Sequence, residues 1–377
     1  MTEVVDYLII GGGPAGTTAA ETIRNEDPNG RIVILEDENH PMYSRIKIPF
    51  YLREIRTREE LFLRTFDSYK EKNIEFLAGK SVSSIDTAAS TVQTADGPEF
   101  GYKKLLISTG GKPRKLNKYQ NEHSMQTVED ADKILEDVRK AKRGVIIGSG
   151  FIALEFLETF LHFALETHLC IAKEGYWETM LTKEMSDVVC GIFEKKGVKI
   201  YFGGTPDFIN AEDVILGTGI GVDTSKDFFT GAGLKYDGGL VSNSNLQTNI
   251  ENVYAAGDVV KYHSQKLDRE VRYGNWTNAI MSGKYAGANM AGKNEVFDVL
   301  SAYSITEEKV GLSVVFLGFS GKDDQTQVKS KRVSDNQGMQ FFIRNGKLDG
   351  CILINLPAER QKYQTIIEER QDFTYNA

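Results

Sequence analysis

The sequence predicts an α/β fold in which two domains are built on parallel sheets and a small α+β domain follows. Three observations carry this prediction. The segments YLIIGGGPAGTTAAE (7–21) and GVIIGSGFIALE (144–155) each have the pattern of a strand, a glycine turn and a helix. Residues 296–377 instead contain apolar runs of strand length around Asn345-Gly346, a strong hairpin signal.

Length and composition indicate an ordinary water-soluble protein of several domains. A chain of 377 residues with 41% hydrophobic and 26% charged residues has room for two or three domains. The sequence contains no run of 18 or more apolar residues, so we expect no membrane-spanning helix. The first residues, MTEVVDYLII, are typical of a first strand rather than of a signal peptide. The net charge of −8 argues against nucleic acid and anionic membranes as partners. Three scattered cysteines without CxxC indicate buried thiols in the cytoplasm and no metal site.

The first glycine segment fits the GxGxxG pattern of a Rossmann-like, dinucleotide-binding unit. Gly11 permits the sharp turn, Gly13 lets the backbone approach a pyrophosphate, and Gly16 lets the helix pack on the strand. Pro14-Ala15 open that helix, whose N-terminal N–H groups attract phosphate. NGRIVILEDE (29–38) predicts the next strand, and Glu36 near its end follows Gly16 by 20 residues. A carboxylate there accepts hydrogen bonds from ribose hydroxyls.

The second glycine segment repeats this layout, with Gly148 and Gly150 in the first two positions and alanine in the third. The acidic position is less regular. Glu174, after the strand in THLCIAKEG (167–175), favours a free ribose and therefore NADH, whereas Lys173 is suited to a 2′-phosphate. We expect NADH rather than NADPH. Two nucleotide folds in one chain imply that a hydride passes between two nucleotides, with FAD in the first domain and NADH in the second.

Further segments resemble the FAD-dependent pyridine nucleotide oxidoreductases, which have the glutathione reductase-like arrangement of two such domains. YKKLLISTGGKPR (102–114), VILGTGIGV (214–222) and NLQTNIENVYAAGDVV (245–260) follow the family order. The family's Arg-Pro-Asn-like run is replaced here by GIGVDTS. HPMYSRIKIPFYL (40–52) is similar to the group of rubredoxin reductases, nitrite reductase flavin domains and oxygenase-type ferredoxin reductases. No cysteine precedes Cys170, so the redox thiols of the disulfide reductases are absent from this region.

The resemblance also implies site residues. Arg45 is expected at the FAD pyrophosphate, Lys47 nearer the flavin ring, and Trp276, in GNWTNAIMSGKYAGANMAG (274–292), on the acceptor side. Glu155 is expected near the nicotinamide. The alternative for Lys47 and Glu155 is that their side chains are solvated. The alternative for Trp276 is a position in the hydrophobic core. The residues that we expect to bind the cofactors are Gly11, Gly13, Pro14, Ala15, Gly16, Glu36, Arg45, Thr109, Gly110, Gly148, Gly150, Glu174, Gly257, Asp258 and Asn278.

The expected domains are an FAD domain (1–112 and 245–295), an NAD(P)H domain (113–244) and a C-terminal domain (296–377). The FAD domain is discontinuous because Asp258 and Trp276 must return to the flavin.

The expected function is transfer of electrons from NADH through FAD to a small carrier, with rubredoxin as the leading candidate, by a monomer or homodimer. An NADH oxidase and a ferredoxin- or nitrite-linked flavin component are alternatives, as is a non-catalytic redox sensor. Because rubredoxins and this chain are both acidic, docking requires a basic patch, for which KSKR (329–332) is a candidate.

Overall fold

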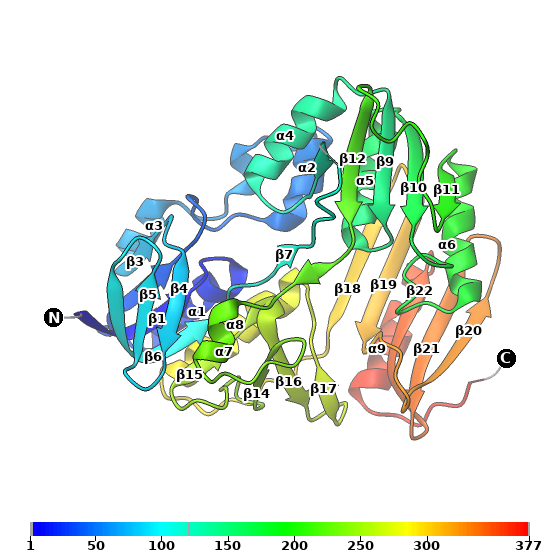
Figure 1. The fold of residues 1–377 in the computed structure, drawn as a ribbon. Helices are drawn as coiled ribbons and strands as arrows, with labels where there is room; N and C mark the ends of the chain where they lie inside the picture. Colours follow the sequence, from blue (N-terminus) through cyan, green and yellow to red (C-terminus); the bar gives the residue numbers. More distant parts are fainter. Residues whose placement is uncertain (1–2, 120, 376–377) are drawn as a thin grey trace. The chain divides into compact units, whose positions relative to one another are not determined.

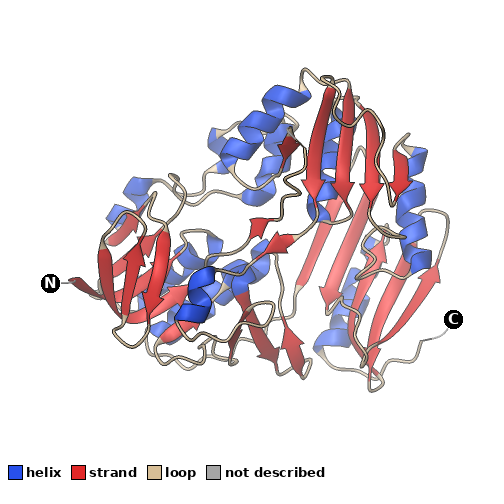
Figure 2. Cartoon of the chain, in the orientation of Figure 1, coloured by secondary structure: helices blue, strands red, loops and turns tan. Residues whose placement is uncertain are grey.

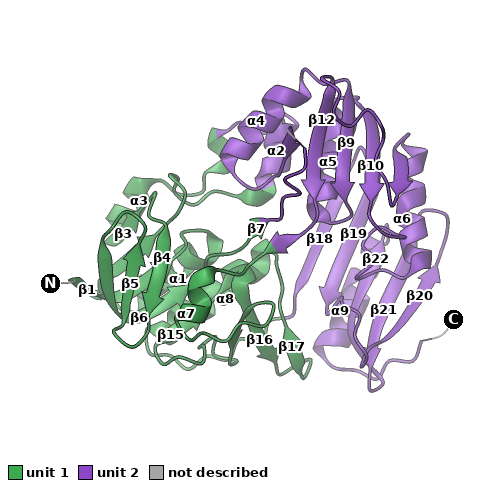
Figure 3. Ribbon diagram, viewed as in Figure 1, with its two compact units in different colours: residues 1–46, 59–112, 223–299 green, residues 47–58, 113–222, 300–377 purple. Residues whose placement is uncertain are grey.

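Residues 3–119 and 121–375 are described by the computed structural model, whose internal contacts divide the chain into two units (Figure 3). Unit 1 comprises residues 1–46, 59–112 and 223–299, and unit 2 comprises residues 47–58, 113–222 and 300–377. The chain passes between the units after residues 46, 58, 112, 222 and 299, and the crossings at 112 and 222 lie within β7 (Lys112–Pro113) and β13 (Val222–Asp223). Both units combine sheets with helices, as the α/β prediction requires (Figures 1 and 2).

Unit 1 is organised around a sheet in the order β3-β2-β1-β6-β5-β4, with β15 also paired to β6. The first half of β6 is antiparallel to β5, whereas its second half lies parallel to β1 and β15. The parallel strands are apolar runs, and all four residues of β2 are buried. The strands are β1 (Glu3–Ile10), β2 (Ile32–Leu35), β3 (Ile74–Leu77), β4 (Val82–Asp86), β5 (Thr91–Thr94), β6 (Glu99–Ile107) and β15 (Val253–Ala255).

Four α-helices and a small second sheet account for most of the remaining elements in the described part of unit 1. The helices are α1 (Pro14–Glu26), α3 (Phe66–Glu71), α7 (Asp227–Gly231) and α8 (Trp276–Met290). The second sheet has the order β14-β16-β17, formed by Leu240–Ser242, Val260–Ser264 and Arg269–Val271. Helix α8 packs along α1, and small residues allow the close approach: a Cβ at Gly283 would lie 2.3 Å from the Ala15 carbonyl oxygen.

Unit 2 contains a parallel sheet in the order β11-β10-β9-β12-β8 and a C-terminal antiparallel sheet in the order β18-β19-β22-β21-β20. Helix α5 contacts both β9 and β18, and α6 contacts both β11 and β20, so these helices lie between the two sheets (Figure 1). The parallel strands are β8 (Glu122–His123), β9 (Arg143–Gly148), β10 (Glu166–Ile171), β11 (Lys199–Phe202) and β12 (Val214–Gly219). The antiparallel strands are β18 (Ala302–Glu307), β19 (Leu312–Gly318), β20 (Gln327–Arg332), β21 (Gly338–Arg344) and β22 (Lys347–Ile354). The helices are α2 (Ile48–Leu52), α4 (Val128–Val138), α5 (Phe151–His162), α6 (Lys183–Lys195) and α9 (Arg360–Glu368).

The predicted hairpin at Asn345-Gly346 is confirmed. Strands β21 and β22 pair antiparallel up to Arg344 and Lys347, and the two turn residues have φ of 51° and 69°. Positive φ at both central positions is the signature of the turn that matches the twist of a two-residue hairpin.

The structural units differ from the expected domain boundaries in two places. Residues 47–58 belong to unit 2 because α2 packs on α4 and α5, and residues 223–244 belong to unit 1, where α7 packs on β4. The C-terminal sheet is joined to the parallel sheet of unit 2 through α5 and α6 rather than standing apart. The division into three domains at the predicted boundaries therefore stays a prediction.

Candidate functional site

The first glycine turn lies between β1 and α1 and leaves no room for side chains at two positions. Gly11 has a φ of +100°, and a Cβ there would lie 2.5 Å from the Ser108 carbonyl oxygen. A Cβ at Gly16 would lie 1.9 Å from the Gly11 carbonyl oxygen. These contacts bring the N-terminus of α1 against the carboxyl end of β1, which is the geometry expected of a dinucleotide fingerprint.

The N-terminus of α1 is shaped to receive an anion. A Cβ at Gly13 would meet no protein atom within 4 Å, so the backbone there faces open space. Pro14 occupies the first turn, Ala15 is buried beside it, and no side chain caps the helix. The partial positive charge of the uncapped helix end therefore faces this space. The turn fits a pyrophosphate, and its assignment to FAD stays a prediction.

Glu36 follows β2 and reaches the glycine turn. Its carboxylate accepts hydrogen bonds from the backbone N–H groups of Gly12 and Glu38, the latter at 3.0 Å. Burial raises the pKa of this carboxyl group. These bonds hold the carboxylate beside the turn, where its remaining lone pairs are suited to ribose hydroxyls.

We expect Glu36→Arg to reduce the bound FAD about tenfold or more, because it removes an acceptor and adds a cation where ribose hydroxyls need a carboxylate. The flavin-to-protein absorbance ratio of the purified protein measures this. Glu71→Arg makes the same charge change at an exposed position of unit 1 and is the matched control. Equal flavin content in both variants would contradict the ribose assignment.

Two further predicted segments meet this turn, because the strands before them end side by side. Ile107 of β6 is in register with both Ile10 of β1 and Ala255 of β15. Beyond β6, the buried hydroxyl oxygen of Thr109 has no hydrogen-bond partner, and Gly110 has a φ of +57°. A buried hydroxyl group without a protein partner, next to an open turn, is suited to bind a polar group of a ligand.

Asp258 lies in a 3₁₀ turn, Gly257–Val259, which begins one residue after the end of β15. Gly257 has a φ of +80°, and a Cβ there would lie 3.1 Å from the Cβ of Ala15. Burial raises the pKa of Asp258, and the charges of Arg272 and Arg45 oppose this effect. Unit 1 thus brings together the glycine turn and the segments of Thr109 and Asp258, which lie far apart in the sequence.

The predicted acceptor-side segment forms the start of α8. Asn275 caps the helix by accepting from the Asn278 N–H at 2.9 Å, and Trp276 is its half-buried first residue. The Asn278 side chain donates to the Tyr273 carbonyl oxygen at 3.0 Å and is almost fully buried. Asn278 therefore holds the loop before the helix, and direct cofactor contact by Asn278 or Trp276 stays a prediction.

Arg45 and Lys47 fall in different units. Arg45 pairs with Glu38 at 2.5 Å, and its guanidinium lies 5.2 Å from the centre of the Tyr43 ring. Because Glu38 also bonds Glu36 through its N–H, Arg45 belongs to the surroundings of the first glycine turn. Lys47 is half-buried at the N-cap of α2 in unit 2. Its expected role near the flavin stays a prediction.

The second glycine turn, in unit 2, has the same form, except that its third glycine position is an alanine and a glycine on a neighbouring strand provides the space for it. Gly148 has a φ of +136°, and a Cβ there would lie 2.2 Å from the Gly219 carbonyl oxygen. Alanine replaces the third glycine, and Gly219 of β12 compensates, since a Cβ there would lie 3.0 Å from the Cβ of Ala153. The buried Tyr176 hydroxyl donates to the Gly150 carbonyl oxygen at 2.8 Å and steadies the turn.

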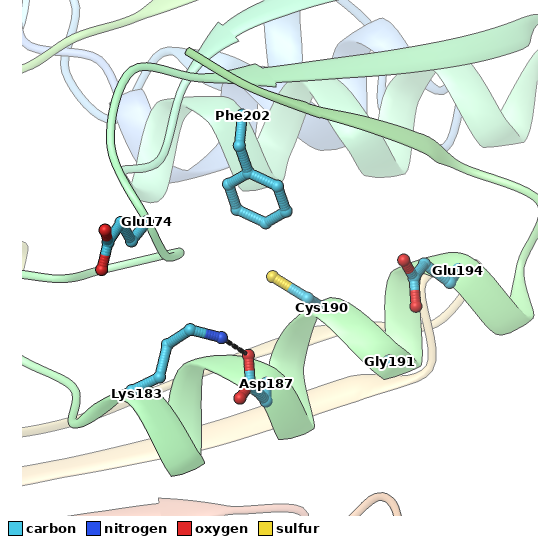
Figure 4. A pocket seen from close by; sticks show the side chains of 7 residues that line it. All are labelled: Glu174, Lys183, Asp187, Cys190, Gly191, Glu194 and Phe202. Atoms are coloured by element: carbon cyan, nitrogen blue, oxygen red, sulfur yellow. Dashed lines mark hydrogen bonds and ion pairs between the residues drawn. The ribbon is translucent and has the colours of Figure 1, made fainter.

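The side chains after β10 bear on the choice of nucleotide. Glu174 lines a groove against α6, as Figure 4 shows. Lys173, the alternative partner for a 2′-phosphate, is exposed and forms an ion pair with Glu178 at 2.5 Å. The arrangement favours a free ribose, as expected for NADH.

The sequence did not reveal a buried cluster of charges in unit 2. Arg53 Nη1 lies 2.7 Å from Glu158 of α5 and 3.2 Å from Glu307 of β18. Glu158 also accepts from the N–H groups of Lys309 at 3.0 Å and Val310 at 2.9 Å. One signal was available: FIALEFLETFLHF contains two acids, at 155 and 158, within a helix that is otherwise mostly apolar.

Glu155 lies one turn from Glu158 on α5 and is half-buried. Burial raises its pKa to about 7, although the charge of Arg53 opposes the rise. Burial likewise raises the pKa of Glu307 to about 8, again opposed by Arg53. Glu155 and Glu307, whose pKa values burial raises to near neutral pH, therefore both lie under the electrostatic influence of one buried cation, Arg53.

The described part of the chain was also searched for disulfide bonds, metal sites and membrane-spanning helices. Cys170, Cys190 and Cys351 are all buried and unpaired. Within residues 3–119 and 121–375, no group of three or more His, Cys, Asp or Glu residues is placed to hold a metal ion. Among the described helices, none is both long enough and apolar enough to span a membrane.

Comparisons with known proteins agree with this geometry. A family model described as pyridine nucleotide-disulphide oxidoreductase matches residues 5–283. The chain is 27% identical to putidaredoxin reductase CamA of Pseudomonas putida, over 97% of this chain and 92% of that protein. It is 22% identical to NADH-rubredoxin oxidoreductase of Clostridium acetobutylicum, over 97% of this chain and 95% of that protein. The solved covalent complex of putidaredoxin reductase with putidaredoxin matches with a TM-score of 0.87 at 25% identity, covering 97% and 93% of the two chains.

Proposed function

Because the chain belongs to the pyridine nucleotide-disulphide oxidoreductase family, we propose that it is an FAD-dependent enzyme that takes hydride from NADH and passes electrons to a small redox carrier protein. One observation carries the proposal: a chain with two glycine turns has no cysteine before residue 170. Without a thiol pair in the first domain, the outlet for the electrons is an external carrier. Rubredoxin is the first candidate, and the two relatives named for such carriers match over nearly their whole length.

The residues of unit 1 suit the binding of FAD, which when bound supplies an acceptor for hydride and a source of single electrons. The N-terminus of α1 and the open backbone at Gly13 would hold the pyrophosphate. Glu36 would accept from the ribose, while Asp258 and the unpaired hydroxyl of Thr109 would hold polar groups beyond it. The N-terminal end of α8 carries a partial positive charge, which stabilises negative charge placed there.

The residues of unit 2 suit the binding of NADH. Gly148 and Gly150 would admit its pyrophosphate to the N-terminus of α5, which no side chain caps. Glu174 would accept from the ribose. Glu155 would lie toward the nicotinamide, where a group with a pKa of about 7 is able to hold or release a proton at neutral pH.

For the carrier, we propose docking on the basic segment KSKR of β20. Lys331 and Arg332 are exposed, although Arg332 pairs with Asp335 at 2.9 Å. Strand β20 is the last strand in the order of the C-terminal sheet. Lysines on such an edge also prevent pairing with another sheet. A local basic segment on a chain of net charge −8 would steer an acidic carrier to one place.

Anaerobic stopped-flow absorbance tests the proposal. The yellow protein is mixed with NADH or NADPH, and then with rubredoxin, a [2Fe–2S] ferredoxin or air. We expect rapid bleaching by NADH, rapid return of colour with rubredoxin, and slow return in air. Rapid return in air alone would instead identify an NADH oxidase, and rapid return with ferredoxin alone would replace the carrier. Failure of both nucleotides to bleach the flavin would overturn the relay.

A further inference from the structure

Residues 176–182, the last part of the connection from β10 to α6, form a loop that holds the second glycine turn by two hydrogen bonds. The Trp177 N–H donates to the Ser149 carbonyl oxygen at 3.2 Å. The Tyr176 hydroxyl donates to the Gly150 carbonyl oxygen at 2.8 Å. The position of the glycine turn therefore depends on the position of this 176–182 loop.

Trp177 has a backbone conformation that needs support from its neighbours. Its φ of +50° lies in the left-handed region, which a bulky side chain rarely adopts. The indole is 3% exposed, and its ring lies 5.2 Å from that of Phe151 of α5 and 5.6 Å from that of Phe316 of β19, measured between ring centres. A strained conformation persists only where the surrounding structure imposes it. For Trp177, these surroundings include a strand of the C-terminal sheet.

The C-terminal sheet also holds the far end of the 176–182 loop, through Gln340 of β21. The side chain of Gln340 is fully buried. Its amide nitrogen donates to the Met180 carbonyl oxygen at 2.6 Å, and its amide oxygen accepts from the Thr182 N–H at 2.7 Å. One side chain thus satisfies two backbone groups of the loop. Because Thr182 is the N-cap of α6, Gln340 fixes the start of that helix as well.

Lys322, in the segment between β19 and β20, gives the 176–182 loop a second attachment. Its ammonium group donates to the Glu178 carbonyl oxygen at 2.6 Å and to the Leu181 carbonyl oxygen. A charged donor makes stronger hydrogen bonds than a neutral one. Three carbonyl oxygens of the loop, those of residues 178, 180 and 181, therefore accept from side chains of the C-terminal part of the chain.

We propose that the C-terminal sheet of unit 2 orders the NADH site through the 176–182 loop, with Gln340 and Lys322 as positioning residues for NADH binding. Both residues act on the loop, and the loop acts on the glycine turn at Ser149 and Gly150. The proposal rests on the proposed function, since it takes the second glycine turn as the NADH site. It gives the C-terminal sheet a role in binding the electron donor.

The test is anaerobic stopped-flow reduction of the FAD-loaded protein over a range of NADH concentrations. This measurement separates the half-saturating NADH concentration from the limiting rate of flavin reduction. We expect Gln340→Met to raise the half-saturating concentration about tenfold, because fewer molecules hold the turn in the arrangement that binds NADH. The limiting rate should change by no more than about twofold, because molecules that have bound NADH are in that arrangement. The FAD content should stay the same, because unit 1 binds FAD.

Gln337→Met is the matched control, because it makes the same change just before β21. The Gln337 amide donates to the Asn355 carbonyl oxygen at 3.0 Å, away from the 176–182 loop. Lys322→Met should raise the half-saturating concentration about threefold or more. Lys322 is exposed, so this variant decides the question if Gln340→Met does not fold. Its control is Lys362→Met, at an exposed position of α9.

The outcomes separate this proposal from the proposed function. If NADH bleaches the flavin but Lys322→Met and folded Gln340→Met have the half-saturating concentrations of their controls, the loop does not order the NADH site and the proposed function stands. Equal increases in the variants and the controls, or loss of FAD from the variants, would also overturn the proposal, since either result indicates general destabilisation. If NADH does not bleach the flavin of the parent protein, the proposed function itself fails.

Discussion

Gly150→Val is expected to lower reduction of the flavin by NADH about 100-fold or more while FAD stays bound, and Gly13→Val is expected to lose the FAD. Both positions tolerate a side chain as far as the protein is concerned. A Cβ at Gly13 meets nothing within 4 Å, and a Cβ at Gly150 lies 3.4 Å from the Gly219 carbonyl oxygen. Their φ angles, −67° and −104°, are available to any residue. The added methyl groups therefore occupy space that the two pyrophosphates need.

The measurements are flavin content by absorbance and bleaching by NADH in the stopped-flow instrument, with far-UV circular dichroism as the check on folding. Gly231→Val, at an exposed glycine of α7 with equally open surroundings, should change neither quantity. Loss of FAD from folded Gly150→Val, or its retention in Gly13→Val, would contradict the assignment of the first turn to FAD and the second to NADH.

Arg53→Met is expected to destabilise the protein by about 3–5 kcal/mol at pH 8 and by much less at pH 5. Arg53 is the cation of the buried cluster with Glu158 and Glu307, and its side chain is 6% exposed. Removing it leaves buried carboxyl groups without their partner. At pH 5 Glu155 and Glu307 bind protons and become neutral, so the loss is smaller.

The sign follows from the native pKa values. Those of Glu155, about 7, and Glu307, about 8, lie above the ordinary value of 4.5. Between about pH 4.5 and 8 the native state therefore binds more protons than the unfolded state, and stability falls as the pH rises. Because the charge of Arg53 lowers both pKa values, its removal raises them further and makes this fall steeper.

Urea unfolding of the FAD-loaded protein, followed by circular dichroism at pH 5 and pH 8, measures the effect. Arg139→Met is the control, because Arg139 pairs with Glu54 where both side chains are about half exposed, and such pairs contribute about 0–1 kcal/mol. A loss in Arg53→Met that is as small as in this control, or equal at both pH values, would show that the cluster does not hold protons.

The sequence alone determined the features that depend on the residues of one short segment. A buried parallel strand needs an apolar run, and a turn with positive φ or a close helix contact needs glycine, so β1, α1, β2 and the turn at Gly11 were all predictable. The same holds for β9, α5 and the turn at Gly148, and for the hairpin at Asn345-Gly346. The position of Glu36 beside its turn followed from the fixed length of a βαβ unit.

The tertiary structure alone decided which distant side chains meet. Arg53 and Glu307 are separated by most of the chain, and neither has a local pattern that reports their common partner, Glu158. Likewise, only the packing of β12 on α5 shows that Gly219 makes room for an alanine in the second fingerprint. Lys173 and Glu174 are neighbours in sequence, and it was the ion pair of Lys173 with Glu178 that distinguished them. Such contacts depend on how helices and strands pack, not on the spacing of residues in the sequence. A side chain is buried only in the folded chain, and burial is what makes a charged group require a partner and shifts its pKa.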